Sequence, residues 1–164
     1  MTILIKQLHP EVNVIGLDGD PVVLEIARSK AVLKNVNITL SFGMAFELPY
    51  PDQSFDRVLS SLMFHHLTSE NKQGTLKEIF RVLKPGGELH IVDFGKPHSL
   101  YAGLISLMMR ELEEAGDNIQ GVLPAMMQKA GFRFVEETQQ YDTIVGGLSL
   151  YKAKKQIGSK DYDE

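Results

Sequence analysis

Along this chain, short runs of apolar residues alternate with segments in which apolar residues recur at helical spacing. This pattern predicts strands and helices in turn. Short apolar runs that end near turn-forming residues predict strands at 12–17, 38–42, 56–61, 88–93, 132–138 and 143–151. Helical spacing predicts helices at 2–8, 21–31, 68–83, roughly 99–115 and 122–130. This order is typical of an α/β fold with a largely parallel sheet and helices on both faces.

Local signals mark several of these boundaries. Asp20 followed by Pro21 predicts a helix start, because Asp accepts hydrogen bonds from free N–H groups and Pro has none to satisfy. Gly131 fits the left-handed cap at the end of a helix. The turn 84–87, Lys-Pro-Gly-Gly, leads from a helix into the strand 88–93. The buried stripe of that helix is expected to be Leu76, Ile79, Phe80 and Leu83.

The last two strands differ from the others. The residues between them, including Glu137, Gln139, Gln140 and Asp142, form too short a connection for a crossover helix. The two strands must therefore pair antiparallel. We expect a mostly parallel sheet that closes with an antiparallel hairpin.

Composition narrows the class of protein. The chain has 164 residues, of which 43% are hydrophobic and 23% charged, as expected for one globular domain over 1–164. Its net charge of −4 argues against a sequence-independent nucleic-acid binder and favours a small-molecule substrate or a protein partner. The absence of cysteine excludes disulfides, thiol nucleophiles and zinc ribbons.

Nothing in the sequence predicts export or a membrane span. The apolar start, 1–6, is too short for a signal peptide and lacks a small-residue cleavage site. The longest apolar stretch, 100–109, is shorter than a transmembrane helix. We therefore expect a cytoplasmic protein.

Asp18 and Gly19 follow the strand 12–17. Ligands collect at the carboxyl ends of parallel strands, and one carboxylate there accepts hydrogen bonds from two adjacent ribose hydroxyls. Gly19 leaves room for a ring to approach the backbone. The alternative is that Asp18 only helps to cap the next helix, a role that Asp20 already fills.

A second group of polar residues follows the strand 56–61. Ser60 and Ser61 end that strand, and His65-His66 comes shortly after. A histidine there has the chemistry to remove a proton from a substrate; the alternative is that one histidine caps the next element while the other is exposed. Asp93, at the end of its own strand, either orients a substrate or caps the next segment. We expect no metal site, since the pair lacks acidic residues at ligand spacing.

Three segments together carry a family resemblance: 55–61 (FDRVLSS), His65-His66, and 81–87 (RVLKPGG) before a strand. They resemble the small-molecule branch of the class I S-adenosylmethionine-dependent methyltransferases, especially the type that acts in ubiquinone and menaquinone biosynthesis. The resemblance implies a Rossmann-like sheet, S-adenosylmethionine as cofactor, and methyl transfer to a small-molecule acceptor.

The resemblance also implies roles for individual residues. Asp18 takes the position of the ribose-binding acid. Met44 and Ala45 take the adenine-binding positions, although the family usually has Asp or another polar residue where Met44 stands. Met44 either packs against the adenine face or is a core residue. The backbone at Ser60 and Ser61 lines the methionine part of the cofactor, and His65 is the candidate catalytic residue at the substrate end.

One family feature has no counterpart in this sequence. Family members open with a strand and a glycine-rich loop, whereas the resemblance begins at Thr2, inside the following helix. The first central strand, between strands 12–17 and 56–61, is therefore expected to be missing, so that each has an unpaired edge. Three explanations stay open: an N-terminally truncated enzyme, a non-catalytic binding or interaction domain, and a homodimer that completes the sheet. A nicotinamide-dependent enzyme is disfavoured by the closing hairpin.

Overall fold

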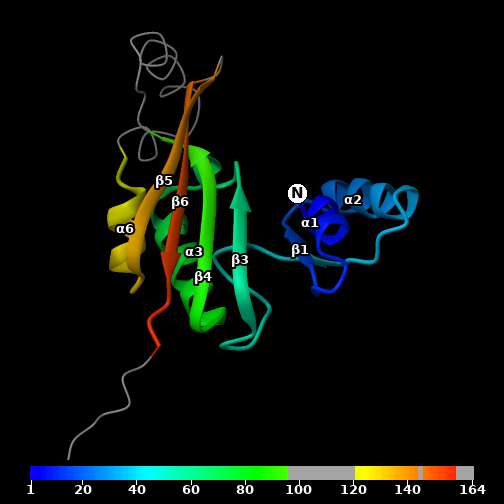
Figure 1. Ribbon diagram of the computed structural model, residues 1–164, viewed down its shortest axis with the longest axis horizontal. Coiled ribbons are helices and arrows are strands. Elements are labelled where there is room, and N and C mark those ends of the chain that lie inside the picture. The colour runs from blue at the N-terminus through cyan, green and yellow to red at the C-terminus, as the bar shows by residue number, and fades with distance from the viewer. Residues whose placement is uncertain (96–120, 144–145, 158–164) are drawn as a thin grey trace, which may run out of the picture. The chain divides into compact units, whose positions relative to one another are not determined.

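A computed structural model describes residues 1–95, 121–143 and 146–157 of the chain (Figure 1). The chain divides into two compact units, Met1–Pro49 and Tyr50–Glu164, each with most of its contacts inside itself. The helix predicted over 99–115 lies outside the described residues.

The first unit contains α1 (Thr2–Leu8), β1 (Ile15–Asp18), α2 (Pro21–Leu33) and β2 (Thr39–Phe42). β1 and β2 pair in parallel. α2 begins as predicted, because the Asp20 side chain accepts a hydrogen bond from the backbone N–H of Val22 at 2.8 Å.

The strand predicted from residue 12 begins only at Ile15. The reason is local: the ammonium group of Lys6 donates hydrogen bonds to the carbonyls of Pro10 and Val12, at 2.8 and 2.7 Å. These bonds hold the preceding segment in a turn. Asp18, expected just beyond the strand, is its last residue.

The second unit is built on a four-stranded sheet in the order β3-β4-β6-β5. Its elements are β3 (Phe55–Ser61), the 3-10 turn η1 (Phe64–His66), α3 (Ser69–Val82), β4 (Leu83–Phe94), α6 (Leu123–Lys129), β5 (Arg133–Thr143) and β6 (Gly146–Lys154). β3 and β4 are parallel, whereas β6 pairs antiparallel with both β4 and β5. The closing antiparallel hairpin is confirmed.

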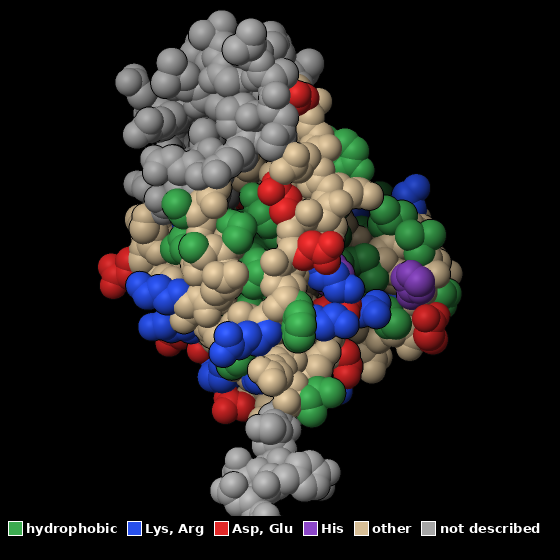
Figure 2. All heavy atoms as spheres, turned by 60° about the vertical axis from the view of Figure 1, so that its left-hand side comes forward, with side chains coloured by type: hydrophobic (Ala, Val, Ile, Leu, Met, Phe, Trp, Pro, Cys, Tyr) green, Lys and Arg blue, Asp and Glu red, His purple; other side chains and the backbone are tan. Residues whose placement is uncertain are grey.

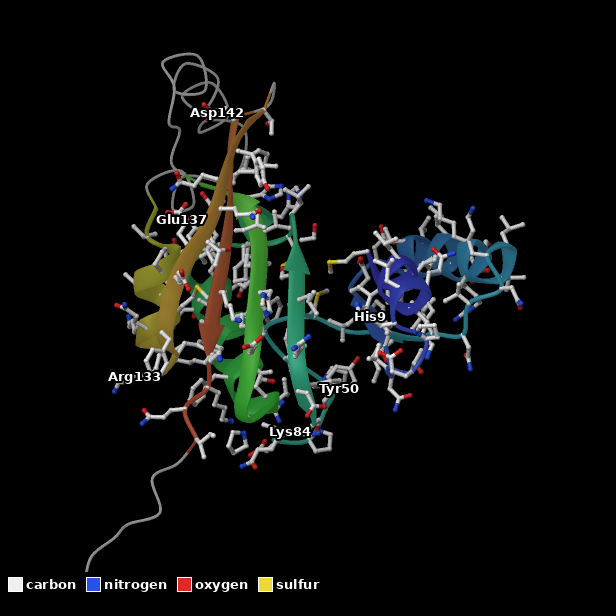
Figure 3. The ribbon with its side chains drawn as sticks, in the orientation of Figure 1. His9, Tyr50, Lys84, Arg133, Glu137 and Asp142 are labelled. Carbon is white, nitrogen blue, oxygen red and sulfur yellow. The ribbon has the colours of Figure 1, made fainter. Side chains whose placement is uncertain are left out.

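The hairpin is longer than predicted. Glu137 and Asp142, expected in the connection together with Gln139 and Gln140, lie along β5 (Figure 3). Two register shifts, between Arg133 and Glu136 and between Glu137 and Gln139, interrupt the alternation of side chains between the two faces. Because of this interruption, the alternation of apolar and polar residues does not continue along β5, and the predicted strand, 132–138, ended too early.

The core of the second unit lies between the sheet and its helices. Leu76, Ile79 and Val82 of α3 are buried, as are Leu89 and Ile91 of β4. Full burial of one such side chain is worth about 1.5–3 kcal/mol. Phe80, predicted in the buried stripe, is instead half-buried. It meets Phe132 edge-on with ring centres 5.2 Å apart, which ties α3 to the segment after α6.

In the described residues, each of the strands β1, β2, β3 and β5 pairs with one neighbour only. Among the residues that the structure describes, β1 pairs only with β2, and β3 pairs only with β4. The predicted strands 12–17 and 56–61 were each expected to have an unpaired edge, and β1 and β3 each pair on one side in the described residues.

Candidate functional site

In the first unit, the carboxyl ends of β1 and β2 lie side by side. Asp18 is opposite Phe42 in the strand register, and the backbone N–H of Gly43 donates to the carbonyl of Asp18 at 3.1 Å. The segments that follow the two strands, one with Gly19 and the other with Met44, therefore start from the same edge. The parallel pairing thus brings together four residues predicted to bind the cofactor: Asp18, Gly19, Met44 and Ala45.

The Asp18 carboxylate has one oxygen engaged in a turn. Its Oδ1 accepts a hydrogen bond from the backbone N–H of Asp20 at 2.9 Å. Asp18 thus does support the start of the helix, which was the alternative to ribose binding, but with one oxygen only. Within the described part of the chain, no hydrogen bond engages its Oδ2. The side chain retains an acceptor for a ligand.

Gly19 and Met44 are in direct contact. A Cβ atom at position 19 would lie 2.9 Å from the Met44 sulfur, closer than such atoms pack. The Met44 side chain is 46% exposed, so it is not a core methionine. Among the described residues, the backbone N–H of the neighbouring Ala45 donates no hydrogen bond. The residues at this edge offer a carboxylate oxygen, an apolar surface and a backbone donor.

In the second unit, Ser60 and Ser61 end β3 with their side chains on opposite faces. Ser60 is buried, and its hydroxyl has no hydrogen-bond partner in the described structure, whereas Ser61 is exposed. A single ligand that contacts both residues therefore does so through the backbone. This geometry fits the role that the resemblance gives to the backbone here.

The next residues turn sharply. Leu62 has a φ of +52°, in the left-handed region that is strained for a leucine. Its N–H donates to the carbonyl of Val92 on β4, at 2.9 Å. The turn leads directly into η1 and its two histidines. Strained backbone that is held by a neighbouring strand is common at functional sites.

His65 and Asp93 form a buried pair. His65 Nδ1 lies 2.8 Å from Asp93 Oδ1, and the residues are 5% and 0% exposed. The His65 ring also meets Phe94 edge-on, with ring centres 4.8 Å apart. His66 is exposed, although its ring lies 3.9 Å from that of His65. Within the described parts of the chain, a carboxylate holds His65 and none contacts His66.

The sequence did not predict this pairing. Asp93 was interpreted as a group that orients a substrate or caps a segment, and the structure joins it to His65 and to the backbone of η1. The available signal was the order of the elements: parallel strands β3 and β4 bring residues just after both strands to one edge. The order of the elements predicts that Asp93 and His65 lie near each other, but it does not predict the hydrogen bond between them.

The open face of the second sheet carries a dense ionic cluster. Glu88 lies 3.0 Å from Lys152, 3.1 Å from His90 and 3.2 Å from Lys154. The hydrogen bond from Lys152, followed by that with His90, lowers the pKa of Glu88 to about 2. Figure 2 shows basic and acidic side chains interspersed on one face of the molecule.

Two hollows in the described residues lie away from Asp18. Two hollows of about 230 and 330 Å³ adjoin Asn37, near the amino ends of β1 and β2. They are at the opposite edge of that sheet from Asp18. They are not part of the candidate cofactor site.

Two kinds of feature are absent from the described residues. No three His, Asp or Glu side chains there lie close enough to hold a metal ion. No helix in residues 1–95, 121–143 and 146–157 has the length and apolar character needed to cross a membrane.

Comparisons with known proteins identify the family. The profile of the family described as "Methyltransferase domain" matches residues 1–87. A demethylmenaquinone methyltransferase of Listeria monocytogenes is 30% identical over 92% of this chain and 72% of that protein. The chain belongs to the class I methyltransferases. S-adenosylmethionine is the cofactor of this family, so the expected cofactor class is confirmed.

Further relatives agree with this assignment. A demethylmenaquinone methyltransferase of Deinococcus radiodurans is 40% identical, over 62% of this chain and only 41% of that protein. A solved S-adenosylmethionine-dependent methyltransferase from Methanosarcina mazei has a TM-score of 0.69 at 19% identity, covering 88% of this chain and 82% of that one. This likeness supports the methyltransferase fold.

Proposed function

We propose that this chain binds S-adenosylmethionine at the carboxyl edge of β1 and β2 and serves methyl transfer to a small-molecule acceptor. The main support is the adjacency of Asp18, Gly19 and Met44 at that edge. Asp18 Oδ2 accepts from the ribose hydroxyls, the Met44 thioether packs on the adenine ring, and the Ala45 N–H donates to that ring. The cofactor supplies an electrophilic methyl group on a sulfonium.

At the acceptor end, we assign proton removal to His65. A histidine is suited to this task because its ordinary pKa lies near neutrality. We assign the backbone at Ser60 and Ser61 to the methionine part of the cofactor, as the family resemblance implies. The names of the relatives make demethylmenaquinone the first acceptor to test.

Cofactor binding is tested by calorimetric titration of the 164-residue chain with S-adenosylhomocysteine. The informative variant is Asp18→Asn. It keeps an oxygen for the N–H of Asp20 and replaces the other acceptor by an amide donor. We expect binding to weaken at least tenfold, since hydrogen bonds to a charged group are worth about 1.5–3 kcal/mol each.

The matched control is Glu25→Gln, which removes an exposed carboxylate on α2 and leaves the strand edge intact. Its affinity should equal that of the unmodified chain. An Asp18→Asn chain with unchanged affinity would contradict the ribose assignment. A folded chain that takes up no S-adenosylhomocysteine would contradict cofactor binding altogether.

A second candidate function is a non-catalytic interaction domain or a homodimer, supported by the unpaired edges of β1 and β3. Backbone groups along an edge strand readily pair with a strand of another molecule. Light scattering after size-exclusion chromatography tests this possibility. A concentration-independent monomer that binds S-adenosylhomocysteine would favour the enzyme, and a dimer without affinity for it would favour the interaction domain.

A further inference from the structure

Asp93 accepts hydrogen bonds from several directions. Its Oδ2 accepts the backbone N–H groups of Met63 and Phe64, at 3.0 and 2.8 Å. Its Oδ1 accepts the N–H of Phe94 at 2.8 Å and lies 2.8 Å from Nδ1 of His65. Backbone N–H groups can only donate. The Asp93 carboxylate therefore acts as the acceptor in its bonds with Met63, Phe64 and Phe94.

These contacts determine which nitrogen of His65 carries the proton. A carboxylate has no proton to give, so the short contact requires that Nδ1 of His65 be the donor. In a neutral imidazole the other nitrogen, Nε2, is then the acceptor. The hydrogen-bond pattern therefore selects one of the two neutral tautomers of His65.

We propose that Asp93 is a positioning residue that holds His65 in the tautomer with the proton on Nδ1, so that Nε2 is the nitrogen that receives a proton from the acceptor. This inference rests on the proposed function, in which His65 removes that proton. The proton moves from the acceptor to Nε2 and leaves an imidazolium, and the adjacent Asp93 carboxylate stabilises its charge. A buried carboxylate that orients a catalytic histidine in this way is a general solution in enzymes.

The same residue ties the histidine to the strained turn. The bonds from Met63 and Phe64 to Asp93 follow directly after Leu62, whose backbone is left-handed. Phe94, next to Asp93 on β4, supplies the ring that meets His65 edge-on. Residues 93 and 94 thus fix both the proton position and the orientation of the His65 ring.

Asp93→Asn is the decisive variant. The asparagine oxygen is expected to take the Oδ2 position, where two N–H groups donate, because an amide nitrogen there would face both donors. Its NH2 group then faces Nδ1 of His65 and the single N–H of Phe94. Since that NH2 donates, Nδ1 must become the acceptor and the proton must move to Nε2.

The experiment is 15N NMR spectroscopy of the histidine rings in the full 164-residue chain, at a pH above the ordinary histidine range. Protonated and unprotonated ring nitrogens have well-separated 15N shifts. The His65 signals are identified by their loss in His65→Gln. We expect the proton on Nδ1 in the unmodified chain and on Nε2 in Asp93→Asn. Asp56→Asn is the matched control, because this carboxylate is 82% exposed and bonded to Lys84; it should leave His65 unchanged.

The unmodified chain tests the inference even if Asp93→Asn does not fold. A His65 with the proton on Nε2 in the unmodified chain overturns it, as does an unchanged tautomer in a folded Asp93→Asn chain. The measurement needs neither cofactor nor acceptor, so its result is separate from the S-adenosylhomocysteine titration. The proposed function fails if the titration fails, whereas the role of Asp93 fails only if the proton of His65 is not where Asp93 requires it.

Discussion

The ammonium nitrogen of Lys155 lies 4.8 Å from the centre of the Phe80 ring and donates a hydrogen bond to the carbonyl of the same residue, at 2.7 Å. It also donates to the carbonyl of Leu83 at 2.7 Å. The last carbonyls of a helix lack partners inside it, so a residue just beyond β6 completes the end of α3. Burial lowers the pKa of Lys155.

We expect Lys155→Met to destabilise the second unit by about 1–2 kcal/mol, because it leaves half-buried carbonyls without donors. The midpoint of urea unfolding measures this loss. The control is Lys77→Met on the exposed face of the same helix. Equal midpoints for the two variants would show that the bonds from Lys155 contribute nothing to stability.

The ionic cluster around Glu88 predicts a pH dependence of stability. Its pKa is lowered from 4.5 to about 2 in the folded protein, so the charged form stabilises the fold at neutral pH. This contribution is complete above the unfolded pKa and is lost as the pH falls toward about 2. Glu88→Gln should therefore reduce the free energy of unfolding near neutral pH, by about 1 kcal/mol after allowance for solvent screening.

The difference between the unmodified chain and Glu88→Gln should shrink as the pH is lowered through this window. Urea titrations at a series of pH values provide the measurement. Asp56→Asn serves as the exposed counterpart and should change stability little at any pH. A difference that stays constant with pH would mean that Glu88 acts through packing.

Gly95 is expected to tolerate no side chain. A Cβ atom there would overlap the Ser149 hydroxyl and lie 2.6 Å from the Ser149 Cβ. Ser149 is completely buried, so it has little room to move. Gly95→Ala should destabilise by about 1–3 kcal/mol, as overpacked cores do. Adding Ser149→Gly should recover most of the lost stability, as measured by thermal unfolding. A double variant that is no more stable than Gly95→Ala would show that the clash with Ser149 is not the cause.

The contact between Gly19 and Met44 predicts a coupled effect on cofactor affinity. Gly19→Ala should displace the flexible Met44 side chain and weaken S-adenosylhomocysteine binding about tenfold, with little effect on stability. In Gly19→Ala/Met44→Ala the clash is gone. If affinity returns, the displaced Met44 side chain is what obstructs the ligand; if it stays low, either the lost thioether or the added methyl group at residue 19 is responsible, and Met44→Ala alone separates the two. Gly19→Ala with full affinity would contradict the site.

Features set by neighbouring residues were largely predictable from the sequence. Asp20 caps α2, and Gly131 adopts a φ of +106° at the end of α6, as their positions indicated. The antiparallel pairing of β5 and β6 followed from the length of the connection. Each of these depends on only a few adjacent side chains and backbone groups.

Features that depend on distant residues were not predictable in the same way. The bond between His65 and Asp93 joins residues 28 positions apart and depends on the register of β3 against β4. The length of β5 depends on two irregularities, at one of which Phe134 adopts a φ of +52° that its sequence does not signal. The packing of α2 also depends on distant residues: Ala31 is buried and Leu24 and Ala27 are half-buried, whereas Val23 is 44% exposed, because a two-stranded sheet covers little of the helix.

The one-sided pairing of β3 has a consequence for solvent exchange. In a parallel strand, successive amide groups point alternately to the two sides, so about half of those in β3 point away from β4. β4 has neighbours on both sides, β3 and β6. In deuterated water, amides along β3 should therefore alternate between rapid and slow uptake, while those of β4 from Glu88 to Val92, which pair on both sides, should all be slow. The alternating deuterium uptake would by itself identify β3 as an outer strand of this sheet.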